Sequence, residues 1–175
     1  GTTAQEMLLL MKKQIYLEYM RYEKNMKGKL DEASLLAQDF RAMIDVLRDP
    51  ASLPALFTDS IRLLCQIIRE QYRVPPLLLI DEYDQPVMSS YEYGDHDSVG
   101  NFFSNLFGSA MKGNPDLGQA LLTGVQRVAK ESIFSQFNNV RVYTVLHRQY
   151  ASYFGFTSSE TEKLLKDFSL SLNQK

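Results

Sequence analysis

Three acidic side chains follow directly on a run of large aliphatic residues at 77–80. The run predicts a strand buried on both faces of a parallel sheet, and ligands of open α/β sheets bind where such strands end. An aliphatic strand that ends in Asp-Glu is typical of ATP-hydrolysing proteins, in which these carboxylates hold Mg²⁺ and prepare a water molecule for attack. We therefore expect Asp81 to hold Mg²⁺ through its water shell, Glu82 to face the attacking water, and Asp84 to brace the turn or support the metal site. The alternative is that these acids only solvate the end of a strand.

A second aliphatic run ends in a hydroxyl and a glycine and is followed by basic residues. We expect Thr123 to hydrogen-bond the attacking water or the γ-phosphate from a neighbouring strand, as sensor residues do. Arg127 and Lys130 are expected to add positive charge beside the phosphates. For these two cations the alternative is a solvated loop surface.

The phosphate-binding loop that such a site needs is missing. No Gly-x-x-x-x-Gly-Lys-Ser/Thr motif occurs in the 175 residues, and the Lys-Gly-Lys at 27–29 lacks both the first glycine and a preceding strand. The chain alone is therefore expected to bind nucleotide weakly or not at all, and to be inactive.

Three other groups are interpreted as structural. Cys65, the only cysteine, is expected to be a small buried apolar residue. The Asp-His-Asp at 95–97 favours a loop and a helix cap over a metal cluster. An aromatic group favours a small core under the last helix over base stacking, and consists of Tyr150, Tyr153, Phe154 and Phe156.

Composition limits the classes of partner. With 45% hydrophobic residues in 175, the chain is long enough for one core, and we expect a single domain. A net charge of -2 provides no basic field for nucleic acid or for an anionic membrane. The apolar cluster at 7–11 ends at Lys12 and Lys13, which argues against a membrane-spanning helix or a secretion signal and predicts a cytoplasmic protein.

The first 74 residues are expected to be mainly helical. Apolar residues at helical spacing predict helices over 8–26, 36–47 and 53–72, with Asp31 capping the second and Asp49-Pro50 ending it.

Residues 75–157 are expected to form the sheet core, with strands at 77–80, 120–125 and 140–146. Pro86 is expected to break regular structure, and 89–100 to form a loop that serves as a lid. Asp97 or Ser98 is expected to cap a helix that stops at 113–115, and a capping box at 157–160 to begin the last helix, within 158–175. The fold predicted is α/β, an incomplete P-loop NTPase-like parallel sheet flanked by helices, with a helical N-terminal third.

Several short motifs follow one another in order, at 79–86, 101–103, 122–127, 130–139 and 153–157. In this series the chain resembles the bacterial AAA-ATPase-like family, whose members commonly carry a nuclease-like domain of the PD-(D/E)XK type after the ATPase part. The resemblance implies a P-loop ATPase domain that uses ATP and Mg²⁺, with Asp81 and Glu82 in its second nucleotide motif (Walker B) and Thr123 on its sensor strand. The chain departs from the family pattern in lacking the phosphate loop and the nuclease-like domain, and in having Gln136 where glycine is expected.

The function predicted is therefore that of the carboxyl-terminal portion of an ATPase domain, either a fragment or a truncated gene product, whose intact parent hydrolyses ATP. Asp81 is assigned to Mg²⁺, Glu82 to catalysis, Thr123 to sensing, and Arg127 with Lys130 to the phosphates. The expected partners are nucleotide and either a nuclease-like effector domain or a second copy. One alternative is a non-enzymatic interaction module that has lost nucleotide binding, and another is a metal-dependent nuclease built on the three acids.

Overall fold

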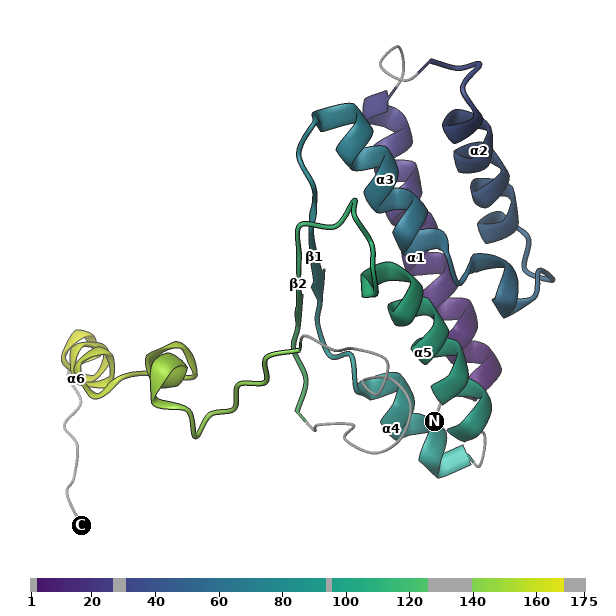
Figure 1. Ribbon diagram of the computed structural model, residues 1–175. Helices are drawn as coiled ribbons and strands as arrows, with labels where there is room; N and C mark the ends of the chain where they lie inside the picture. The colour runs from purple at the N-terminus through teal and green to yellow at the C-terminus, as the bar shows by residue number, and fades with distance from the viewer. Residues whose placement is uncertain (1–2, 27–30, 94–95, 126–139, 169–175) are drawn as a thin grey trace. The chain divides into compact units, whose positions relative to one another are not determined.

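The computed structural model describes residues 3–26, 31–93, 96–125 and 140–168 of the chain. It divides into two compact units, Gly1–Asn138 and Asn139–Lys175, which are described separately. The predicted organisation of residues 1–175 as one ATPase-type domain stays a prediction. The elements, in chain order (Figure 1), are α1 (Ala4–Met26), α2 (Leu35–Arg48), η1 (Pro54–Phe57), α3 (Ser60–Tyr72), β1 (Leu77–Ile80), α4 (Gln85–Tyr93), α5 (His96–Met111), β2 (Gln119–Leu122), η2 (Arg148–Tyr153) and α6 (Ser158–Asp167).

The N-terminal helices confirm the apolar periodicity, with two corrections at their ends. Ser34, not Asp31, caps α2, because the Ser34 hydroxyl accepts the Ala37 N–H at 3.2 Å. Asp31 instead accepts the Ala33 N–H at 3.0 Å and stabilises the turn before the helix. The single helix expected over 53–72 is two elements, η1 and α3. The Thr58 hydroxyl donates to the Ala55 carbonyl at the end of η1, and this side-chain bond interrupts the helix between the two elements.

Aromatic residues from four elements form the core of the first unit. Tyr19 of α1 stacks on Phe40 of α2 with ring centroids 5.0 Å apart, and its hydroxyl donates to the Ser60 carbonyl at 2.6 Å. Burial of each such ring stabilises the fold by about 2 kcal/mol. Cys65 is buried in α3 as predicted, and burial raises the pKa of its thiol to about 11. The aromatic core is completed by Phe57 of η1 and by Phe102, Phe103 and Phe107 of α5.

The sheet consists of two parallel strands in the described part of the chain. β1 pairs with β2 in a register that places Leu78 opposite Ala120 and Ile80 opposite Leu122. The predicted parallel pairing is confirmed, and the first unit is mostly helical with a small sheet, which is compatible with an α/β class.

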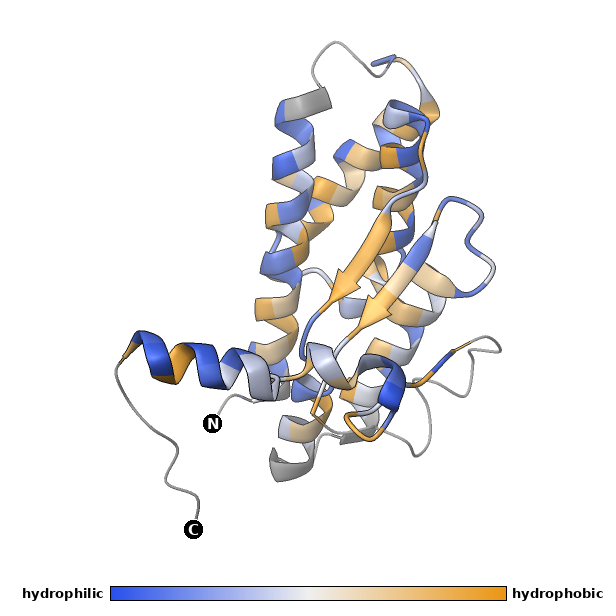
Figure 2. Cartoon of the chain, turned by 90° about the vertical axis from the view of Figure 1, so that its left-hand side faces the viewer, coloured by the Kyte–Doolittle hydropathy of each residue, from blue (hydrophilic) through white to orange (hydrophobic). Residues whose placement is uncertain are grey.

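The prediction that β1 is buried on both faces is wrong. Ile80 and Leu122 pack against the hydrophobic core, whereas Leu77, Leu79 and Leu121 are 58%, 64% and 57% exposed. Side chains alternate along a strand, so every second residue faces away from the helices. Figure 2 shows the two largely apolar strands in front of the helices of the first unit.

The connection from β1 to β2 contains the helices α4 and α5, so the loop expected at 89–100 is wrong for 89–93 and 96–100, whereas 94–95 lie outside the described residues. Pro86 lies in the first turn of α4, where its missing N–H costs no helical hydrogen bond. Asp97 and Ser98 lie inside α5 instead of capping it, because α5 begins at His96. The predicted stop is confirmed: α5 ends at Met111, and Gly113 has the left-handed φ of 58° that favours glycine.

The second unit confirms one prediction and corrects two. The capping box is present at the start of α6, where the Glu160 carboxylate accepts the Thr157 N–H at 2.8 Å and the Thr157 hydroxyl oxygen accepts the Glu160 N–H at 3.4 Å. Residues 140–146 do not form the expected strand, and the described part of this unit, 140–168, contains no strand that could pair with their backbone groups. The expected aromatic core is also wrong, since Tyr153, Phe154 and Phe156 are exposed.

Within the described residues, none of the helices has the length and apolar character needed to cross a membrane.

Candidate functional site

The carboxyl ends of β1 and β2 meet and bring Asp81 next to Thr123. The Thr123 N–H donates to the Ile80 carbonyl at 2.9 Å, and the Tyr83 N–H donates to the Thr123 carbonyl at 3.1 Å, so the ladder continues past both strands. The Thr123 hydroxyl donates to Oδ1 of Asp81. Parallel pairing in this register therefore joins two predicted site residues that are 42 positions apart in the sequence.

Asp81 has the environment of an exposed carboxylate held by neutral donors. Besides the Thr123 hydroxyl, its Oδ1 accepts the Glu82 N–H at 3.0 Å. Neither donor cancels the negative charge, which faces solvent. Exposed carboxylate and hydroxyl oxygens are ligands that suit Mg²⁺, which keeps several of its waters and takes only one or two carboxylates from a protein. The residues present therefore fit the metal, although no group of three His, Cys, Asp or Glu gathers anywhere in the described ranges.

Glu82 follows in a strained backbone conformation. Its φ is 53°, in the left-handed region that few residues other than glycine adopt, at a cost of about 1 kcal/mol. Its side chain is exposed, and the residue directly follows Asp81 in the sequence. This conformation turns the chain sharply after β1, and the Gln85 N–H then donates to the Glu82 carbonyl at 3.0 Å at the start of α4.

Asp84 braces the turn after β1, which is one of the two roles predicted for it. Its side chain is only 1% exposed, and Oδ2 accepts the Val125 N–H at 2.9 Å. Its backbone carbonyl accepts the Met88 N–H at 2.9 Å, in the first turn of α4. Asp84 thus ties the segment after β2 to the start of α4. The buried position also separates its carboxylate from the exposed ones of Asp81 and Glu82, so the three acids do not converge as a nuclease site would require.

Gly124 permits this close approach. A Cβ at this position would lie 2.6 Å from Oδ1 of Asp84 and 2.8 Å from Cε1 of Tyr83, distances that side-chain atoms do not tolerate. The sequence showed a glycine after a hydroxyl but gave no sign that a buried carboxylate lies against it.

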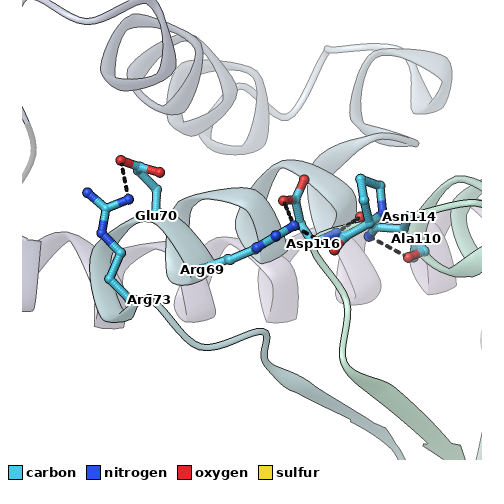
Figure 3. Close-up of polar contacts among 7 residues, drawn as sticks. Arg69, Glu70, Arg73, Ala110, Asn114 and Asp116 are labelled. Atoms are coloured by element: carbon cyan, nitrogen blue, oxygen red, sulfur yellow. Dashed lines mark hydrogen bonds and ion pairs between the residues drawn. The ribbon is translucent and has the colours of Figure 1, made fainter.

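The start of β2 is held by a polar clamp that the sequence analysis missed (Figure 3). Nη1 of Arg69, on α3, donates to the Asp116 carboxylate at 2.9 Å and to the Pro115 carbonyl at 2.7 Å. The Asn114 side chain donates to the Ala110 carbonyl at 2.7 Å. Together with the Gly118 N–H, which donates to the Pro76 carbonyl at 3.0 Å, these contacts set the register that brings Thr123 to Asp81. The i and i+47 spacing of Arg69 and Asp116 carries no signal in a single sequence.

The remaining predicted site residues cannot be compared with the structure. Arg127, Lys130 and Gln136 lie outside the described residues, as does Asp95. His96 and Asp97, the other members of the Asp-His-Asp group, lie in the first turn of α5.

Comparison with known proteins gives one finding. A family model described as "Predicted AAA-ATPase" (AAA-ATPase_like) matches residues 6–134, from the first turns of α1 to beyond the Asp81–Thr123 contact. The comparisons with curated proteins and with solved structures found no match.

Proposed function

The chain belongs to the AAA-ATPase-like family, and from this premise we propose that it is part of a P-loop-type ATPase whose intact form binds and hydrolyses ATP. Membership gives a general ATPase-like role. The observation that carries the finer proposal is the Asp81–Thr123 contact at the adjoining carboxyl ends of two parallel strands, the place where such sheets bind ligands.

The chain's own residues have distinct tasks in this proposal. Asp81 would hold Mg²⁺ through its water shell, and Thr123 hydrogen-bonds the attacking water or the γ-phosphate. Glu82, which is exposed and follows Asp81 in the sequence, accepts the proton of the attacking water. Arg127 and Lys130 add positive charge beside the phosphates. Mg²⁺, when bound, neutralises the phosphate oxygens. The phosphate-binding loop is absent from these 175 residues, so the parent supplies it from elsewhere, together with either a nuclease-like effector domain or a second copy.

The test is ATP turnover by the parent protein carrying Glu82→Gln. Loss of a positioned proton acceptor is expected to reduce turnover by a factor of about 100 or more, while ATP binding is retained because the amide preserves shape and removes only the charge. Glu70→Gln, at an exposed residue in the last turn of α3 before the amino end of β1, is the matched control and should turn over ATP at the wild-type rate. Undiminished hydrolysis by Glu82→Gln would refute the assigned role.

The open face of the sheet favours a second candidate, an interaction module without enzymatic activity. Leu77, Leu79 and Leu121 form an apolar surface on strands of a kind that is usually covered on both faces. Measuring ATP binding by the parent, with and without Mg²⁺, separates the two candidates. Absence of binding in both conditions would identify the interaction module.

A further inference from the structure

A pocket away from the ends of the strands gathers three cations where α1 passes the end of α2. Its volume is about 330 Å³. Lys12, Lys13 and Tyr16 line it from α1 and Arg48 from the last position of α2, with Leu9 and Pro50 forming an apolar wall. Among the described residues that line this pocket none is acidic, in a chain whose net charge is -2.

Lys12 is buried there against neutral partners. Its side chain is 4% exposed, and its ammonium donates to the Asp49 carbonyl and to the Ser52 hydroxyl and lies 5.5 Å from the centroid of the Phe57 ring. An ammonium has three N–H donors, of which these partners use two. Burial of a cation without an opposite charge costs stability that a bound anion offsets.

Arg48 is held at the rim by Tyr16. A side-chain hydrogen bond with Tyr16 raises the pKa of Arg48 above its ordinary value, and Asp45 and Glu23 act in the same direction more weakly. Neither of these two acids lines the pocket. Arg48 and Lys13, both exposed, therefore line the same pocket as the buried Lys12.

A purely structural role explains part of this arrangement. Lys12 stabilises the turn after α2 through the Asp49 carbonyl. That role does not account for two further cations and an apolar wall around one pocket. We propose that this pocket binds the phosphate group of a small phosphomonoester. Arg48, Lys12 and Lys13 contact the phosphate oxygens, and Leu9 and Pro50 contact the carbon skeleton. A phosphate fits better than a carboxylate because it carries close to two negative charges and three acceptor oxygens for three cations.

The test measures binding of phenyl phosphate to the 175-residue chain by calorimetry. The wild-type chain is expected to bind this probe saturably, and Arg48→Ala to weaken binding by about tenfold or more, because a charge-assisted hydrogen bond is lost. Arg41→Ala, on α2 but outside the pocket, is the matched control and should bind like the wild type. Lys13→Ala provides a second exposed variant, since Lys12→Ala removes a buried side chain and can prevent folding.

Two further measurements distinguish a phosphomonoester from free phosphate, and this pocket from the proposed ATPase site. Phenyl phosphate should bind several times more tightly than inorganic phosphate, and Leu9→Ser should remove that difference, because the apolar wall contacts only the ring. Asp81→Asn should leave binding unchanged, which separates this pocket from the proposed ATPase site. Absence of saturable binding, equal binding by Arg48→Ala, or equal affinity for the two probes would overturn the proposal.

Discussion

Gly124 and Asp84 lie in tight contact beside the proposed site. The Asp84 carboxylate accepts the Val125 N–H while the Gly124 backbone lies directly against it. Residue types alone predicted acids after one strand and a hydroxyl after another, and the structure brings Asp81 and Thr123 together. The steric need for glycine at position 124 could not be predicted, because it is imposed by Asp84, which lies 40 positions earlier in the sequence.

Replacement of Gly124 by alanine tests this contact. The added methyl would overlap Asp84 and Tyr83, so Gly124→Ala is expected to lower the free energy of unfolding by about 2–3 kcal/mol. Urea unfolding followed by circular dichroism measures the change.

Gly113→Ala is the matched control. Nothing lies within 4 Å of a Cβ there, so the cost should be only the left-handed strain at a φ of 58°, about 1 kcal/mol. Equal costs at the two positions would mean that steric overlap with Asp84 does not occur in solution.

The helix ends and the start of β2 depend on contacts of different range. The stop of α5 and the cap of α6 use residues a few positions apart and were predicted, whereas the caps predicted for α2 and α5 were wrong. The break expected at Pro86 is wrong, because proline breaks a helix only beyond its first turn and Pro86 is the second residue of α4.

Arg69→Ala tests the clamp on β2. Its partner Asp116 is largely covered, so we expect a loss of about 1 kcal/mol and shifted amide resonances at Thr123, because the register of β2 depends on the clamp. Arg73→Ala breaks only an exposed i,i+3 pair with Glu70 and should cost about 0.3 kcal/mol, with no shift at Thr123. Unchanged Thr123 resonances in Arg69→Ala would count against the clamp.

The capping box of α6 predicts a pH dependence. The hydrogen bonds from the Thr157 hydroxyl and N–H lower the pKa of Glu160 below its ordinary 4.5. A lowered folded-state pKa stabilises the helix above pH 4.5, and this contribution is lost as the pH falls through the folded-state pKa.

Thr157→Val removes the hydroxyl and should raise the pKa of Glu160 towards 4.5, as measured by the carboxyl carbon shift in an NMR titration. Thr161→Val, whose hydroxyl donates to the Thr157 carbonyl instead, should leave the Glu160 titration unchanged. An unaltered titration in Thr157→Val would contradict the box.

Among the described residues of the first unit, helices pack on one face of a small parallel sheet, and leucines on its opposite face are exposed. Leu79→Thr keeps a strand-forming residue on this open face and is expected to change stability by less than about 0.5 kcal/mol. Leu106→Ala, in the core, should cost about 3 kcal/mol. If Leu79→Thr is as damaging as the core variant in a chemical denaturation experiment, the outer face is covered in solution.

Residue order was enough to predict helices, a parallel strand pair, the cap at Thr157 and a carboxylate where β1 ends. These features depend on neighbours within a turn, on short aliphatic runs and on the order of strands and helices along the chain. Residue order left open which sheet face the helices cover, the burial of Asp84, and the clamp from Arg69 to Asp116. These features arise from packing between segments some 40 positions or more apart. Such contacts depend on the relative placement of whole elements, about which the spacing of residues within one element carries no information.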